Sequence, residues 1–187
     1  RSGLVGRHQG ENACTAIAAT WLLRTSGIAV TEEHVRTGVA SATWPGRFEV
    51  VSGRGPRVVL DGAHTPASAR ALAEALRETG SSPAFVVLGL LGDKDARTIG
   101  EELAPVAERF FITTPRSPRA ASTQSVTEQL AVLGRQIDRA SDVASALAQA
   151  MNEAGPSGGV VVTGSLTTVA EAREALGLGV ADPPVDD

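Results

Sequence analysis

The stretch VVLDGAHTPAS, from Val58 to Ser68, contains the residues that decide the fold. Three apolar residues lead into Asp61, a glycine and a lone histidine follow, and Pro66 opens an alanine-rich helical pattern. Proline suits the first turn of a helix, because its missing N–H has no partner there. The stretch therefore predicts a buried strand, a tight turn and an amphipathic helix, the repeating unit of α/β folds.

The chain after Thr43 continues this alternation. Short apolar runs predict strands at Phe48–Val51, Val58–Asp61, Ala84–Leu90, Arg109–Thr114 and Val160–Thr163, with a weaker one at Gln136–Arg139. Between the runs, apolar residues recur at helical spacing, as at Ala69, Leu72, Ala73 and Leu76 and at Val143, Ala146, Leu147, Ala150 and Met151. Apolar strands alternating with amphipathic helices predict a mostly parallel sheet that is covered on both faces.

The first 43 residues follow a different pattern. They predict one helix over residues 11–26 and a second from Thr31 through Val39, before Pro45 and Gly46 break the periodicity. We therefore expect a domain boundary close to Thr43. The first residues include no methionine and pass quickly into a helix, so we expect this chain to begin inside something larger. The last seven residues, ADPPVDD, predict a frayed tail.

Composition limits the class of protein. Apolar residues make up 42% of the 187, enough for a sizeable core, and the net charge of −4 without a basic block argues against nucleic acid. Cys14 is the only cysteine, so an internal disulfide is excluded and a reducing, cytoplasmic compartment fits. The sequence predicts neither a membrane span nor a signal peptide.

Polar residues follow several predicted strands, where α/β sheets bind ligands. Asp61 can hold a ribose hydroxyl, and His64 can meet a phosphate at the helix start, or the two form an ordinary turn with an exposed histidine. Lys94, the only lysine, lies in GDKD, where it can meet a carboxylate or phosphate. The alternative is a solvated helix cap made by Asp93 or Asp95.

Three further motifs carry similar alternatives. Ser165 in TGSLTT fits either an anion nest or a helix cap. Arg47 in WPGRFE fits either a phosphate clamp or a linker with a surface arginine. In GRHQGENA, amide side chains beside a histidine can read an adenine edge, or they cap the helix; the residues are His8, Gln9 and Asn12.

Several functional signatures are absent from the sequence. It contains no phosphate loop of the G-x-x-x-x-G-K-[ST] type, no G-x-G-x-x-G after a strand and no G-x-S-x-G elbow. The three histidines have no metal-ligand spacing.

Taken together, the order and spacing of the motifs resemble those of one family. LVGRHQGENACTAIAA, WPGRFEVV, VVLDGAHTP, GDKD, SPRA and TGSLTTVAEAR, between Leu4 and Arg173, resemble the second half of the folylpolyglutamate synthase/dihydrofolate synthase family of Mur-ligase-like amide ligases. The resemblance implies that residues 1–43 are the last helices of a central ATPase domain. Residues 44–180 would then form a Rossmann-like, three-layer glutamate-ligase domain with about six strands, and residues 181–187 the tail.

The resemblance also implies a reaction. A pteroate or folate carboxylate attacks the γ-phosphate of ATP, and the amine of L-glutamate displaces phosphate from the resulting acyl phosphate, with Mg²⁺ neutralising charge. The resemblance also implies a role for each matching residue. Asn12, with His8 and Gln9, would contact adenine. Arg47 would contact the ATP phosphates, Asp61 the ribose, and His64 would act in catalysis near the transferred phosphate. Lys94, Ser165 and Arg119 would bind glutamate. We expect no metal ligand in this chain and a monomeric protein.

Two departures from the family qualify this expectation. Thr65 stands where the family usually has asparagine, so a second amide donor is lost. The phosphate loop, the magnesium ligands and the modified lysine of the central domain are missing, which predicts that the chain alone is inactive. A nucleotide- or amino-acid-binding module without chemistry, or part of another Mur-like ligase, are the alternatives.

Overall fold

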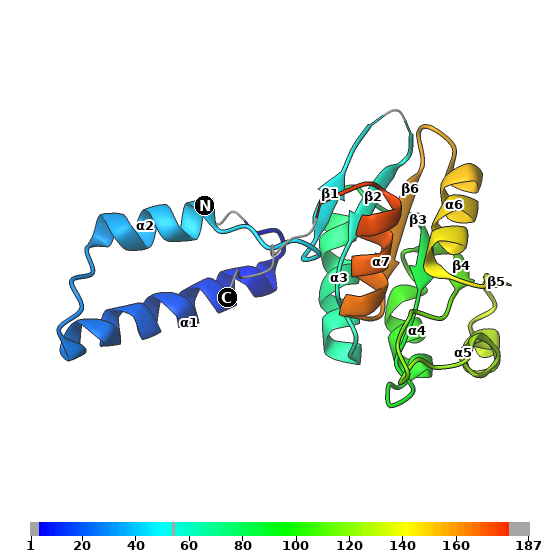
Figure 1. Ribbon diagram of the computed structural model, residues 1–187, viewed down its shortest axis with the longest axis horizontal. Helices are drawn as coiled ribbons and strands as arrows, with labels where there is room; N and C mark the ends of the chain where they lie inside the picture. The colour runs from blue at the N-terminus through cyan, green and yellow to red at the C-terminus, as the bar shows by residue number, and fades with distance from the viewer. Residues whose placement is uncertain (1–3, 54, 180–187) are drawn as a thin grey trace, which may run out of the picture. The chain divides into compact units, whose positions relative to one another are not determined.

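The computed structural model describes residues 4–53 and 55–179, and the chain divides into two compact units between Trp44 and Pro45. The first unit holds α1 (Arg7–Leu23), a 3₁₀ turn η1 (Arg24–Ser26) and α2 (Glu32–Ser41), with the two α-helices running in opposite directions (Figure 1). The Oγ1 atom of Thr31 accepts the His34 N–H at 3.1 Å, which fixes the start of α2. The predicted helix over residues 11–26 begins four residues earlier than expected and ends in the 3₁₀ turn.

Among its described residues, the second unit is a six-stranded sheet with five α-helices and one 3₁₀ turn, η2 (Ala131–Leu133). Its strands are β1 (Glu49–Val51), β2 (Arg57–Leu60), β3 (Ala84–Leu88), β4 (Ala107–Ile112), β5 (Gln136–Arg139) and β6 (Gly159–Thr163). The spatial order is β1-β2-β6-β3-β4-β5, in which β1 pairs antiparallel with β2 and every other pair is parallel. The expectation of a mostly parallel α/β sheet is confirmed.

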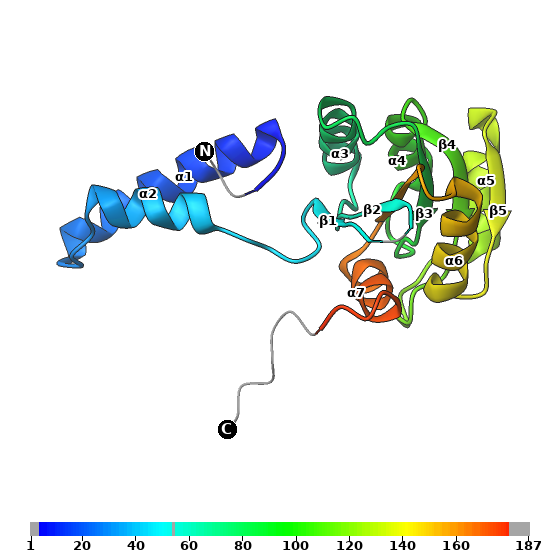
Figure 2. The same ribbon diagram turned by 90° about the horizontal axis from the view of Figure 1, so that it is seen from above.

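The helices of this unit cover both faces of the sheet. They are α3 (Pro66–Glu78), α4 (Ala96–Leu103), α5 (Thr123–Leu130), α6 (Val143–Ala154) and α7 (Leu166–Ala175). Figure 2 shows α3, α4 and α5 on one side of the sheet and α6 and α7 on the other. Two separate clusters of buried residues match this division, one around Leu72, Ile99 and Leu130, the other around Leu147 and Val169.

Strands β2, β3 and β6 are apolar except at their ends, because both of their faces are buried there. Val58 and Leu60 of β2 point to the α6–α7 side, and Val59 points to the α3–α5 side. In β6, Val160 and Val161 divide in the same way, and each is fully buried. Such strands read as continuous apolar runs rather than as alternating patterns, which is why sequence periodicity found them.

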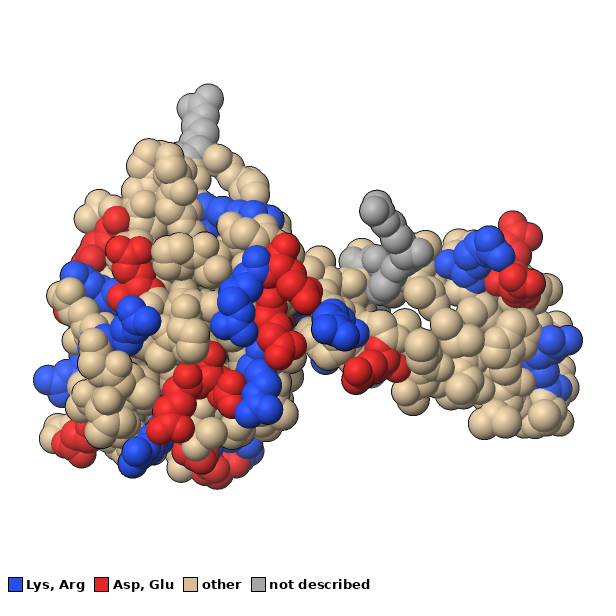
Figure 3. Space-filling model, turned by 180° about the vertical axis from the view of Figure 1, so that it is seen from behind, with Lys and Arg blue, Asp and Glu red and all other residues tan. Residues whose placement is uncertain are grey.

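Charged side chains of both signs lie on the surface of the second unit. The face in Figure 3 shows basic and acidic side chains interspersed on the sheet unit. In the described part of the chain, no helix combines the length and the apolar character needed to span a bilayer.

We expect Leu76→Ala or Leu147→Ala to lower the free energy of unfolding by about 2–5 kcal/mol, because each truncation leaves a cavity in one of the two buried clusters. Leu76 is 0% exposed and Leu147 2% exposed. Urea denaturation measures the change. Val132→Ala is the matched control, since Val132 is 63% exposed and its truncation should cost less than about 0.5 kcal/mol. An unchanged midpoint in both leucine variants would contradict the packing.

Candidate functional site

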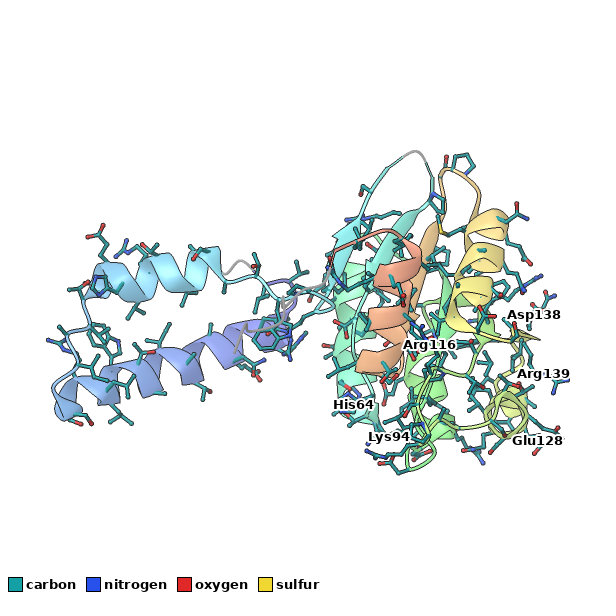
Figure 4. All side chains as sticks on the ribbon, viewed as in Figure 1. His64, Lys94, Arg116, Glu128, Asp138 and Arg139 are labelled. Atoms are coloured by element: carbon teal, nitrogen blue, oxygen red, sulfur yellow. The ribbon has the colours of Figure 1, made fainter. Side chains whose placement is uncertain are left out.

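The carboxyl ends of the parallel strands form the edge at which the predicted site residues of the second unit lie. β6 lies between β2 and β3, and the helix that follows β6 packs on the opposite face from the helices that follow β2 and β3. The strand order therefore switches on both sides of β6. Open α/β sheets bind ligands beyond the carboxyl ends at such points. Figure 4 shows His64, after β2, and Lys94, after β3, at this same end of the sheet.

Asp61, directly after β2, holds two backbone amides. Its Oδ2 atom accepts the Phe48 N–H at 2.8 Å, and its Oδ1 atom accepts the Ala63 N–H at 2.9 Å. The carboxylate thus joins the β2 loop to the turn that carries Arg47. Asp61 therefore has a structural role in fixing the loop after β2, besides any contact with a ligand.

His64 is exposed and oriented by its own loop. Its Nδ1 atom lies 2.8 Å from the Gly62 carbonyl oxygen. Since a carbonyl can only accept, Nδ1 carries the hydrogen, and Nε2 is the nitrogen left for another partner. Among the described residues Nε2 has no hydrogen-bond partner. A protonated ring would present an Nε2–H donor beside the start of α3, as binding of a phosphate oxygen requires.

Thr65 is the N-cap of α3. Its Oγ1 atom accepts the Ser68 N–H at 3.2 Å, and the Ser68 hydroxyl accepts the Thr65 N–H at 2.9 Å in return. A cap needs an acceptor, which threonine and asparagine both supply. The departure at this position therefore leaves the helix start intact.

Arg47 lies in a tight turn just before β1. Gly46 has φ +71° and Phe48 has φ +46°, the left-handed region on both sides of the arginine. The Gly46 carbonyl accepts the Gly62 N–H at 2.9 Å, so the turn is fastened to the β2 loop a second time. Arg47 itself is exposed.

The loop after β6 is tied to its neighbours on both sides. The Ala63 carbonyl accepts the Gly164 N–H at 2.9 Å and the Thr163 hydroxyl at 3.2 Å. On the other side, the Thr168 hydroxyl donates to the Gly89 carbonyl at 2.8 Å. Gly164, with φ +108°, makes this close approach feasible, because a Cβ there would lie 2.5 Å from the Gly89 oxygen.

Ser165 is 3% exposed and caps α7. Its Oγ atom accepts the Thr168 N–H at 3.0 Å and lies 2.7 Å from the Thr168 hydroxyl. Because the Thr168 hydroxyl donates its only hydrogen to the Gly89 carbonyl, the Ser165 hydroxyl must be the donor in the Ser165–Thr168 bond. It then has no hydrogen left for a ligand carboxylate while these bonds hold.

Lys94 and Arg119 share one carboxylate. The Lys94 ammonium lies 3.0 Å from Asp93 Oδ2, and the Arg119 guanidinium lies 3.2 Å from Asp93 Oδ1. The loops that carry them are joined by a Gly92 N–H bond to the Arg119 carbonyl at 2.7 Å and by a bridge between Leu91 and Ala120. The hydrogen bond from Lys94, with a smaller effect of the Arg119 charge, lowers the pKa of Asp93 below its ordinary value.

Asp95, rather than Asp93, caps α4. Its two oxygens accept the Thr98 N–H at 3.0 Å and the Thr98 hydroxyl at 2.7 Å, and these bonds lower the pKa of Asp95. Asp93 is thereby left to the two cations. Sequence reasoning treated both acids as capping candidates and assigned Asp93 no further part. The signal that was present is its position beside the only lysine.

The residues predicted to contact adenine form a small network at the start of α1. The Gln9 amide nitrogen lies 2.8 Å from His8 Nε2, and Asn12 Nδ2 donates to Gln9 Oε1 at 3.1 Å. Gln9 is 2% exposed, whereas Asn12 is exposed. These residues belong to the first unit, and the remaining predicted site residues belong to the second.

A surface hollow of about 310 Å³ lies apart from these residues. Arg116, Asp142, Glu171 and Glu174 line it, together with Ala144 and Ala175. Glu171 accepts the Arg116 N–H at 2.6 Å, and the Arg116 guanidinium pairs with Glu174. The charged contacts of Arg116, labelled in Figure 4, therefore join the loop after β4 to α7.

A metal site is not found in residues 4–53 and 55–179: no three side chains of His, Cys, Asp or Glu converge there in a way that suits a cation.

Comparison with known proteins matches this architecture to one family. The Mur ligase, glutamate ligase domain model matches residues 46–166. The Escherichia coli dihydrofolate synthase/folylpolyglutamate synthase is 38% identical over 88% of this chain and 37% of its own length. A probable bifunctional folylpolyglutamate synthase/dihydropteroate synthase of Halobacterium salinarum is 38% identical over 98% of this chain and 22% of its own length.

Solved structures of folylpolyglutamate synthases have the same fold as this chain. The Mycobacterium tuberculosis folylpolyglutamate synthase complexed with ADP and AMPPCP superposes with a TM-score of 0.82 at 33% identity, covering 94% of this chain and 41% of that one. The chain thus spans between about a fifth and two fifths of the length of these relatives. The matched region contains the sheet, the Arg47 turn and the strand-end loops, and on this evidence the chain belongs to the Mur ligase, glutamate ligase domain family, in its folylpolyglutamate synthase/dihydrofolate synthase branch.

Proposed function

We propose that this chain is the C-terminal part of an ATP-dependent ligase that joins L-glutamate to dihydropteroate or folate. The observation that carries the proposal is the row of hydrogen-bonded loops along the carboxyl edge. The row runs from the Arg47 turn through Asp61 and Ala63 to Gly164, and on through Gly89 at the end of β3. Along this row, Arg47, Asp61 and His64 are the proposed nucleotide-binding residues beside β2, and Lys94 and Arg119 are the proposed carboxylate-binding pair beyond β3.

The set beside β2 suits the ATP half of the reaction. A folate carboxylate oxygen attacks the γ-phosphorus, the bond to ADP breaks, and an acyl phosphate forms. Arg47 and protonated His64 would donate hydrogen bonds to the phosphate oxygens on which charge develops. Asp61 would accept from a ribose hydroxyl. His8, Gln9 and Asn12 would contact adenine from the first unit.

The pair beyond β3 suits the glutamate half. Lys94 and Arg119 offer two cations, and a glutamate carboxylate can replace or join the single carboxylate of Asp93 between them. The glutamate amine then attacks the acyl carbon, phosphate leaves, and an amide forms. Ser165 would support this site as the cap that orders the first turn of α7.

ATP, Mg²⁺ and the remaining N-terminal part of the enzyme would complete the reaction in the cytoplasm. We assign the phosphate loop and the magnesium ligands to that other part, because the sequence has no phosphate-loop motif and its only lysine is Lys94. On this proposal the chain alone binds ligands weakly and turns over none.

A second candidate is a ligase that acts on a cell-wall precursor. A Synechococcus elongatus UDP-N-acetylmuramoyl-L-alanyl-D-glutamate–2,6-diaminopimelate ligase is 36% identical over 88% of this chain. Supplying the full-length enzyme with dihydropteroate or with a UDP-muramoyl peptide and measuring ADP release separates the two. ADP release with the muramoyl peptide alone would reject the folate proposal.

In the full-length enzyme, Arg47→Ala and His64→Ala should each lower kcat on the order of 100-fold, the effect of removing one donor to a developing oxyanion. Thermal melting should shift little, because both side chains are exposed. Arg57→Ala is the matched control, since Arg57 is an exposed arginine at the opposite end of β2. Full turnover by either site variant would remove that residue from the site.

The purified chain, mixed with ATP, glutamate and dihydropteroate, should release no ADP. Calorimetry with ATP or glutamate should show at most weak binding, because each ligand would meet only part of its site. Tight binding without turnover would instead favour a stand-alone binding module, and glutamate-dependent ADP release would overturn the proposed inactivity.

Lys94→Gln should raise the pKa of Asp93 towards the ordinary aspartate value of about 3.9, and Arg119→Gln should raise it less. A carboxyl whose pKa is lowered by folding stabilises the protein above its unfolded pKa. That contribution disappears as the pH falls through the folded pKa.

Carbon-13 NMR titration of the Asp93 carboxyl measures the shift. Arg97→Gln is the control, because Arg97 pairs with Glu101. An Asp93 titration unaltered by Lys94→Gln would contradict the shared ion pair.

A further inference from the structure

Three backbone groups fix the turn that carries Arg47. The Gly46 N–H donates to Glu49 Oε2 at 2.7 Å, and the Gly46 carbonyl accepts the Gly62 N–H at 2.9 Å. On the other side of the arginine, the Phe48 N–H donates to Asp61 at 2.8 Å. Both flanking peptides are therefore held, and the Arg47 backbone lies between two fixed points.

The conformation of the turn explains why it needs this support. A phenylalanine at φ +46° lies in a region that side chains with a Cβ rarely adopt. Phe48 is 4% exposed, so its ring anchors the strained residue in the core below α3. Strained backbone of this kind persists only where the surroundings over-determine it, and it concentrates at functional sites.

Helix α7 supplies the last support, through two residues on one face. A Cβ on Gly46 would lie 2.6 Å from Val169 Cγ1, so α7 packs directly against the turn. One helical turn further on, the Arg173 guanidinium forms an ion pair with Glu49 Oε1 and also donates to the Gly179 carbonyl at 3.1 Å. The side chains of Arg173 and Glu49 are 14% and 25% exposed, so the pair is largely shielded from water.

We propose that Glu49 and Arg173 are positioning residues for Arg47. Glu49 holds the Gly46 N–H with one oxygen and Arg173 with the other, and so transmits the position of α7 to the arginine turn. The first turn of α7 is tied by Thr168 to Gly89, at the end of the strand that leads to Lys94. α7 thus links the proposed phosphate side to the proposed glutamate side. The inference rests on the proposed function, in which Arg47 contacts the phosphates.

The test uses the full-length ligase and three variants. Glu49→Gln keeps an oxygen for the Gly46 N–H but loses the charge that holds Arg173. Arg173→Gln removes the same pair from the other side, and the double variant removes both partners. We expect each single variant to lower kcat by about 10–100-fold, as misplacement of a catalytic group does, with the KM for glutamate unchanged. The double variant should be no worse than either single variant, because the two residues act as one unit.

Arg70→Gln is the matched control. Arg70 pairs with Glu102 between α3 and α4, by the same guanidinium and carboxylate groups, and lies outside the proposed site. Its kcat should equal that of the wild type. Arg173→Lys is a milder variant in case Arg173→Gln does not fold. Its single ammonium cannot replace the two-sided contact with Glu49 and Gly179, so kcat should again fall.

Arg47→Ala, assayed in parallel, distinguishes failure of the positioning role of Glu49 and Arg173 from failure of the proposed function. Loss of turnover in Arg47→Ala with wild-type kcat in Glu49→Gln and Arg173→Lys would overturn the positioning role and leave the proposed function standing. Wild-type kcat in Arg47→Ala would overturn the proposed function itself. Additive losses in the double variant would show that Glu49 and Arg173 act separately, and would also overturn the inference.

Discussion

The position of β6 between β2 and β3 is the constraint on which the rest of the second unit depends. β6 pairs in parallel with both neighbours, through Val58–Val160 on one side and Phe85–Val160 on the other. The loop after β6, the last strand in the sequence, therefore lies between the loops after β2 and β3, which come about 100 and 75 residues earlier in the chain. The helix that follows β6 must also pack on the other face, since α3 and α4 already cover the first. A ligand site at the switch points on either side of β6 follows from this topology.

The loops at that edge are joined to one another by hydrogen bonds. Ala63 accepts two donors from the end of β6, Asp61 accepts two backbone amides, and Gly89 accepts the Thr168 hydroxyl. Each bond satisfies a backbone group that would otherwise lack a partner near the core. Residues that offer chemistry, such as His64 and Arg47, can then remain exposed while their backbones are fixed. The proposed ligase reaction, which must align a phosphate with an incoming amine, would gain from this arrangement, because misplacement of reacting groups is costly.

The sequence predicted the helices and strands of the second unit better than their arrangement. The β2 and β6 runs were clear, since strands buried on both faces are apolar throughout, and Pro66 marked the start of α3. Strand order was not readable, because the β6 pairing joins segments far apart in the chain. Phe48 was predicted to begin a strand but adopts a left-handed turn, which no local propensity favours for phenylalanine. The link from Glu49 to Arg173 spans 124 positions, so only the folded chain reveals it.

The direction of hydrogen bonds also separates residues that look equivalent in a motif. Ser165 and Lys94 are both proposed to serve the glutamate side, yet their chemistry differs. The Lys94 ammonium has three hydrogens, of which Asp93 takes one, so it can bind a further carboxylate without giving up its partner. The Ser165 hydroxyl has one hydrogen, and Thr168 already receives it, because Thr168 donates its own to Gly89. A carboxylate can therefore bind Lys94 and Arg119 without breaking any of these bonds, whereas a direct bond from Ser165 would first have to break its bond to the Thr168 hydroxyl. The remaining lone pair on Ser165 suits a donor, which is the character of the amine rather than of the carboxylate.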